Sequence, residues 1–121
     1  MQSKVYAMMD EAVADVPDSA TLMIAGFGPG TPNNLLDALH RQGAKKLTGI
    51  CNFPGGLGQS PFGNLIIDKR FIKMRCAFTD VGRSSMTVPF FEAYQAGEVD
   101  AELMSQGTLA ERIRGFCDRT W

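Results

Sequence analysis

The chain has 121 residues, a formal net charge of −1, 45% hydrophobic residues and 21% charged residues. Such a length and balance are typical of one soluble globular domain that can bury a core. The charge argues against a protein built to bind nucleic acid, which would concentrate Lys and Arg. No apolar run approaches the roughly 20 residues of a membrane helix, so we expect neither a nucleic-acid partner nor a membrane.

The first 43 residues predict a helix, a strand and a second helix. Apolar residues recur at helical spacing from Val5 to Val16, and Pro17 ends that pattern. The run 20–27, ATLMIAGF, has no polar alternation and predicts a strand covered on both faces of a parallel sheet. Residues 33–43 predict a helix with its leucines on one face and a glycine as its C-cap.

The rest of the chain repeats the alternation of strand and helix. We predict strands at 46–51, 71–78 and 98–104, and helices at 62–70, around 89–97 and at 107–114. Loops at 52–61 and 79–85 separate them. Strands that alternate with helices imply right-handed crossovers, an α/β fold with a parallel, layered sheet and flanking helices, and a single domain over residues 1–121.

The residues that ordinarily do catalysis or bind metals are few. Cys51, Cys76 and Cys117 have no C-x-x-C spacing, and two of them stand in apolar runs. We interpret them as reduced, buried thiols of a cytoplasmic protein. His40, the only histidine, cannot build a zinc site or a Ser/His/Asp set by itself. We therefore expect no metal.

Three loops follow predicted strands, where ligands of open α/β sheets bind. The loop 25–35 carries Gly26, Gly28 and Gly30 before a helix; it suits close approach of a ligand to the backbone, but it is equally a simple tight turn. In the loop 51–59, Asn52 could bind a carbonyl or an amide, or merely form a turn.

The third loop, 104–111, places polar residues before the last predicted helix. Ser105 or Thr108 could cap that helix, with Glu111 in its first turn. Gln106 is not needed for capping. Its amide could donate to a developing oxyanion, or it could be a solvated polar residue.

Together these segments resemble the alpha subunit of the family I coenzyme A transferases. DSATLMIAGFGPGTPNNLLDAL is similar to the N-terminal signature of that family, LTGICN to its L-T-x-x-S-N segment, and AGEVDAELMSQGTLAERIR to its S-G-E-L-E-V-E-L-x-P-Q-G-T-L-A-E-R-I-R segment. The resemblance runs from KVYA to Arg114 and is strongest to the 3-oxoacid and acetate transferases. It implies a partial CoA-transferase (NagB/RpiA-like) domain.

The resemblance also implies an activity. The family moves CoA from an acyl-CoA to a free carboxylate without a bound cofactor, through a glutamate that attacks the thioester. Gln106 matches the family's oxyanion donor. Asn52, Gly26, Phe27, Gly28, Gly107 and Thr108 match residues of the substrate and CoA site.

Several positions depart from the family pattern. The nucleophilic glutamate belongs to an S-E-N-G motif of the second, beta subunit, which this sequence lacks, so we expect a beta-type partner and a hetero-oligomer that acts on acyl-CoA and carboxylates. The substituted positions are Ser19, Ala25, Asn33, Phe53 and Ser105. The C-terminal half of the family domain is expected to be missing after about residue 114, where GFCDRTW resembles a foreign tail. The alternative is a non-catalytic remnant that binds acyl-CoA or a carboxylate, or modulates such an enzyme.

Overall fold

A computed structural model gives the arrangement of the chain and describes residues 3, 5–56, 59–80 and 88–117. Four parallel strands form one sheet in the order β1-β2-β3-β4. The strands are β1 (Thr21–Met23), β2 (Leu47–Cys51), β3 (Phe71–Cys76) and β4 (Asp100–Leu103). The helices are α1 (Met9–Val13), α2 (Asn33–Gln42), α3 (Pro61–Ile67), α4 (Pro89–Gln95) and α5 (Gln106–Cys117). The predicted α/β fold with a parallel sheet is confirmed.

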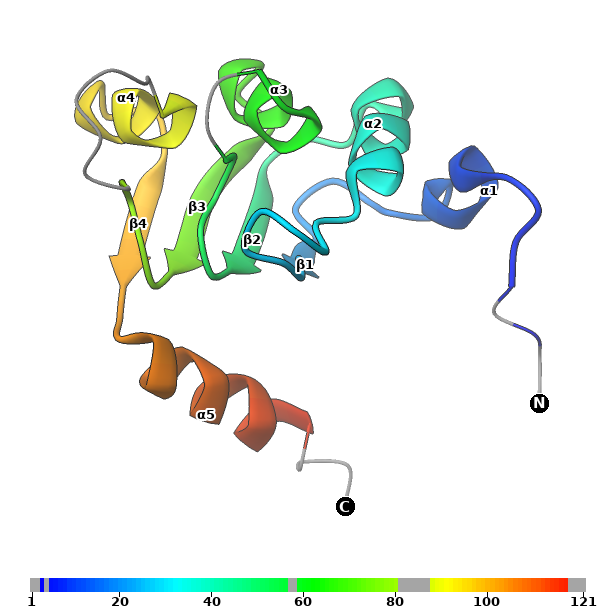
Figure 1. Cartoon of the computed structure of the whole chain (residues 1–121). Helices are drawn as coiled ribbons and strands as arrows, with labels where there is room; N and C mark the ends of the chain where they lie inside the picture. Colours follow the sequence, from blue (N-terminus) through cyan, green and yellow to red (C-terminus); the bar gives the residue numbers. More distant parts are fainter. Residues whose placement is uncertain (1–2, 4, 57–58, 81–87, 118–121) are drawn as a thin grey trace.

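The strand order places the helices on one side of the sheet. Each strand lies beside the next one in sequence, and α2, α3 and α4 make the crossovers. Right-handed crossovers that always advance in one direction must all lie over the same face. Figure 1 shows these three helices side by side, with α5 beyond the arrowheads of the strands.

The core lies between the sheet and these helices. Its largest fully buried side chains include Phe71, Phe90, Leu47, Leu65 and Met74. Burial of each such side chain contributes about 1.5–3 kcal/mol, so this one layer accounts for most of the packing. Of the residues that the structure describes, no helix is long and apolar enough to cross a bilayer.

The helix boundaries follow local chemistry. Ser60 caps α3 by accepting a hydrogen bond from the Gly63 N–H at 2.9 Å, and Pro61 occupies the first turn. Gly43 ends α2 in the left-handed conformation, with φ of 96°, as predicted. His40 lies in α2 and pairs with Asp68 at the end of α3, so it links two helices at the amino edge of the sheet.

Three expectations need correction or stay open. The first helix is five residues long, because Val5 and Met8 are exposed and have no core to pack against. The strand β1 is not covered on both faces, since Thr21 and Met23 are exposed on the side opposite the helices. Most of the loop predicted at 79–85 falls outside the described residues.

Candidate active site at the carboxyl edge of the sheet

The carboxyl ends of all four strands meet at one edge, and the chain segments that leave them are hydrogen-bonded together. The Asn52 carbonyl, just after β2, accepts hydrogen bonds from the N–H groups of Ala77 at 3.0 Å and Phe78 at 3.1 Å, just after β3. The Met104 N–H, after β4, donates to the Cys76 carbonyl at 3.0 Å. Short parallel strands thus deliver residues from distant parts of the sequence to one small region.

Three of the predicted site residues are joined by side-chain hydrogen bonds in this region. Asn52 Nδ2 donates to the Gly26 carbonyl at 3.4 Å, and Gln106 Nε2 donates to Asn52 Oδ1 at 3.4 Å. Asn52 is half-buried, whereas Gln106 is exposed. The asparagine therefore bridges the loop after β1 and the start of α5, and it directs the amide of Gln106.

A cavity of about 710 Å³ opens beside this network. Asn52, Gln106 and Arg114 contribute polar side chains to its lining, and Leu109 and Ile113 contribute apolar ones. Gly107 lies at an open part of the cavity, because a Cβ at that position would meet no atom within 4 Å. Gln106 and Gly107, which line this cavity, form the N-terminus of α5, and a helix N-terminus favours negative charge.

The start of α5 is held by its own hydroxyl groups. The Thr108 N–H donates to Ser105 Oγ at 3.4 Å, and the two hydroxyl oxygens are 2.8 Å apart. Ser105 is thus the cap that the sequence indicated as one option. Thr108 supports the turn that carries Gln106, and it is not part of the cavity wall.

The loop after β1 places its predicted residues in two environments. Gly26 has a φ of 99°, and a Cβ there would lie 2.5 Å from the Thr31 nitrogen, so only glycine fits the turn. Phe27 packs against Phe53 and Phe78, with ring centroids 6.2 Å and 5.2 Å away. Gly28 lines a separate cavity of about 220 Å³ together with Phe53 and Ser60.

The two described cysteines are buried in the sheet. Cys51 and Cys76 are paired across β2 and β3, are buried, and are free thiols. Burial raises the pKa of Cys76 to about 11, and it raises the pKa of Cys51 further. They are the buried thiols that the sequence predicted, and the side chain of Cys117 is outside the described part.

An ion cluster next to the site was missed in the sequence. Glu102 on β4 accepts hydrogen bonds from Arg112 on α5 at 2.5 Å and from Arg75 on β3 at 2.9 Å. These two guanidinium groups, Arg112 first, hold the pKa of Glu102 below its usual value. The signal in the sequence is a pair of basic residues two positions apart in 71–76 and a pair of acidic residues two positions apart in 100–103.

Known proteins are similar to this chain over most of its length. Residues 6–115 match the sequence profile of the Coenzyme A transferase family. The chain is 38% identical over 114 residues to the alpha subunit of 3-oxoadipate CoA-transferase from Pseudomonas putida, covering 93% of this chain and 48% of that protein. It is 38% identical over 115 residues to the human succinyl-CoA:3-ketoacid coenzyme A transferase 2, mitochondrial, covering 94% of this chain and 21% of that protein.

A solved structure shares the fold. The crystal structure of a variant of the decarboxylase AibA/AibB superposes with a TM-score of 0.76 at 24% identity, covering 94% of this chain and 44% of that chain. The chain thus spans about half the length of the bacterial alpha subunit that it matches. With the profile match over residues 6–115, the chain belongs to the Coenzyme A transferase family and is similar to its alpha-subunit members.

Proposed function

We propose that this chain takes part in transferring CoA between an acyl-CoA and a free short-chain carboxylate or 3-oxoacid. The observation that carries the proposal is the Gln106 amide nitrogen, directed by Asn52 and placed at the start of α5 beside the cavity of about 710 Å³. A neutral amide donor at a fixed position stabilises negative charge that develops on a substrate oxygen. The cytoplasm is the expected location.

The nucleophile in this proposal comes from a partner. The sequence holds no S-E-N-G motif, and the relative from Pseudomonas putida is named as one subunit of its enzyme. Both facts support a beta subunit that supplies the glutamate at the carboxyl edge of the sheet. Gln106, Asn52 and Gly107 then line the part of the shared site that this chain contributes, Gly26 and Thr108 support them, and Phe27 and Gly28 belong to the adjoining loop.

The proposed reaction alternates attacks by a carboxylate and by the CoA thiolate on carbonyl carbons. The partner's glutamate attacks the thioester, the C–S bond breaks, and CoA leaves as the thiolate, so that an acyl-glutamyl anhydride remains. The thiolate then attacks the glutamyl carbonyl of the anhydride, releasing the first carboxylate and leaving a glutamyl-CoA thioester. A second carboxylate reverses both steps. Each attack puts negative charge on a carbonyl oxygen, to which Gln106 donates.

Co-expression tests this proposal. The chain is produced with a beta subunit of the family, the complex is purified, and exchange between succinyl-CoA or acetyl-CoA and a small carboxylate is measured. Turnover that neither chain has alone supports the proposal. A stable complex without turnover contradicts it and favours the alternative, a protein that binds acyl-CoA or a carboxylate or modulates a transferase. Failure to form any complex contradicts it as well.

A further inference from the structure

Helix α5 begins with Gln106, but it touches the sheet through a narrow apolar contact. Among residues 106–115, whose side chains the structure describes, only Leu109 is buried and only Ile113 is half-buried. These two residues have i, i+4 spacing, so they lie on one side of the helix, one above the other. Such a contact fixes where α5 lies against the sheet, but not the direction of its axis. A second contact that holds this direction therefore also positions the Gln106 amide.

One carboxylate supplies this second contact by tying α5 to two strands. Glu102 on β4 accepts a hydrogen bond on Oε1 from Arg112 Nη1 of α5 at 2.5 Å, and on Oε2 from Arg75 Nε of β3 at 2.9 Å. Isolated ion pairs on a surface contribute little. Here three groups form a network, the Arg75 and Glu102 side chains are each only 37% exposed, and the two residues are in register on neighbouring strands. The sheet therefore holds the carboxylate in place, and Arg112 attaches the helix to it.

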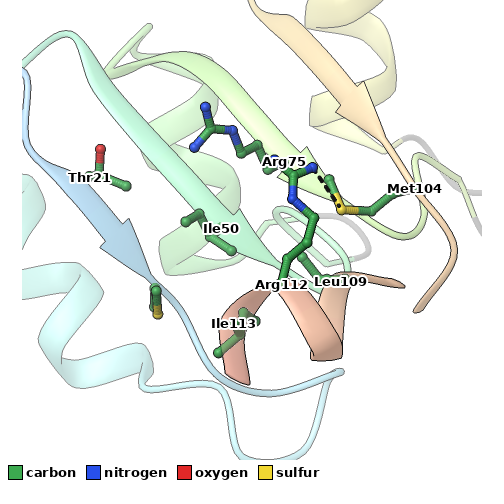
Figure 2. A pocket seen from close by; sticks show the side chains of 8 residues that line it. Thr21, Ile50, Arg75, Met104, Leu109, Arg112 and Ile113 are labelled. Carbon is green, nitrogen blue, oxygen red and sulfur yellow. Dashed lines mark hydrogen bonds between the residues drawn. The ribbon is translucent and has the colours of Figure 1, made fainter. Parts of the chain in front are cut away.

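The contact between Glu102 and Arg112 closes a short loop around Gln106. The two residues are ten positions apart, and Gln106 lies between them. Arg112 Nη1 also reaches Met104 Sδ, at 3.5 Å, in the segment that leads from β4 into α5. Figure 2 shows the Arg112 side chain rising from α5 toward the sheet, with its contact to Met104 as a dashed line. Both ends of the turn that carries Gln106 are thus attached to β4, and from this position Gln106 Nε2 reaches Asn52 Oδ1.

We propose that Glu102 is a positioning residue for Gln106: held by Arg75, its carboxylate retains Arg112 and thereby fixes the direction of α5 from which the amide is presented. Glu102 is not among the residues that line the cavity of about 710 Å³ beside Gln106, so it acts through the glutamine and not on a substrate. The catalytic part of this proposal rests on the transferase function proposed above. The positional part concerns the folded chain alone.

Side-chain amide NMR of the isolated, ¹⁵N-labelled 121-residue chain tests the positional part. Two references bracket the Gln106 resonances: wild type, in which Asn52 accepts from the amide, and Asn52→Ala, which lacks that acceptor. We expect Glu102→Gln to move the Gln106 resonances toward their positions in Asn52→Ala. Glu98→Gln is the matched control and should leave them at the wild-type positions. Glu98 is also 37% exposed and pairs with Lys69 at 2.9 Å, but it precedes β4, whereas α5 follows that strand.

A double-mutant cycle in the complex with the beta subunit tests the catalytic part. We expect Glu102→Gln alone to lower kcat about tenfold, which corresponds to one lost hydrogen bond between charged groups. The double variant Glu102→Gln/Gln106→Ala should have the kcat of Gln106→Ala, because a residue that acts through the glutamine then has nothing to position. Arg112→Lys, which keeps a cation for the carboxylate, should retain most of the kcat that Arg112→Met loses.

The outcomes distinguish this proposal from the transferase function. Gln106 resonances that stay at the wild-type positions in both Glu102→Gln and Arg112→Met would overturn the positional link, whether or not the complex turns over. Equal shifts in Glu102→Gln and Glu98→Gln would overturn it too, because the loss of any carboxylate would then act alike. A loss of kcat in the double variant that is the product of the two single losses would leave Glu102 with a structural role only. A wild-type complex without turnover would contradict the transferase function, and the NMR comparison would still decide the positional link.

Discussion

Gln106 and Asn52 are 54 residues apart in the sequence, yet Gln106 Nε2 donates to Asn52 Oδ1 at 3.4 Å. The contact arises because β2 and β4 are parallel and end at the same edge of the sheet. One N–H of the glutamine amide is engaged by the asparagine, which leaves the other free to point at a ligand.

Asn52→Ala removes the group that directs the amide of Gln106. We expect kcat of the complex with the beta subunit to fall about tenfold, which corresponds to one lost hydrogen bond. Steady-state kinetics on the purified complex give the value. Asn34→Ala, on the exposed side of α2, is the control. An unchanged kcat for Asn52→Ala would mean that Asn52 does not position Gln106.

Gly26→Ala should destabilise the fold strongly. The substitution adds a Cβ 2.5 Å from the Thr31 nitrogen at a φ of 99°, so we expect a loss of about 3 kcal/mol or more in the free energy of unfolding. Gly97→Ala is the control, because its φ is 72° but its Cβ would meet nothing within 4 Å. It should cost about 1 kcal/mol from backbone strain alone. Urea unfolding measures both, and equal losses would contradict the close approach at Gly26.

Lowering the pH should weaken the packing of α5 against the sheet. The pKa of Glu102 is lowered in the folded chain, chiefly by Arg112 and then by Arg75. The stabilisation that the ionised Glu102 gives by pairing with Arg112 of α5 is therefore fully present above the ordinary glutamate pKa of about 4.3. It is lost as the pH falls through the lowered pKa of Glu102. Hydrogen-exchange protection factors of α5 should drop over that range while those of α3 hold. Glu102→Gln should remove the pH dependence, and protection of α5 that is independent of pH in wild type would contradict this account.

The thiols of Cys51 and Cys76 should be inert in the folded chain. In a Cys117→Ser background, an aromatic disulfide reagent at a pH of about 8 should label neither thiol in the native protein and both in denaturant. Because the pKa of Cys76 is raised to about 11, folding stability should decline as the pH rises from the unfolded thiol pKa of about 8.5. Rapid labelling of the native chain would contradict the burial of these thiols.

The elements with strong local signals were predictable from the sequence. The helix that ends at Gly43 and the buried strand β2 carry their own patterns, a leucine face with a glycine cap and a short apolar run. The first helix was predicted too long, because periodicity from Val5 onward cannot reveal that no surface exists for Val5 to pack against. Likewise, the apolar run around β1 indicates burial but not whether the second face of the sheet is covered.

The sequence predicted which loops form the candidate site, but not the contacts between their side chains. Parallel-sheet topology alone predicts that Gly26, Asn52 and Gln106 share an edge, and the hydrogen bonds at 3.4 Å agree with that. The family resemblance, not the spacing, supplied the roles proposed for them. The charges on the two strands hint at ion pairs between them, but the partners in the Arg75–Glu102–Arg112 cluster depend on the register of β3 with β4 and on where α5 turns back, which the sequence does not give.

The central claim is that Gln106 stabilises the oxyanion in a CoA-transferase completed by the beta subunit. The most direct measurement is kcat for CoA exchange by the purified complex, compared between wild type, Gln106→Ala and Gln95→Ala. Gln95 is an exposed glutamine at the end of α4, so its substitution should leave kcat unchanged. The account predicts that Gln106→Ala lowers kcat by about 10²–10³, as loss of an oxyanion donor does. A kcat within twofold of wild type (about 0.4 kcal/mol) would contradict it.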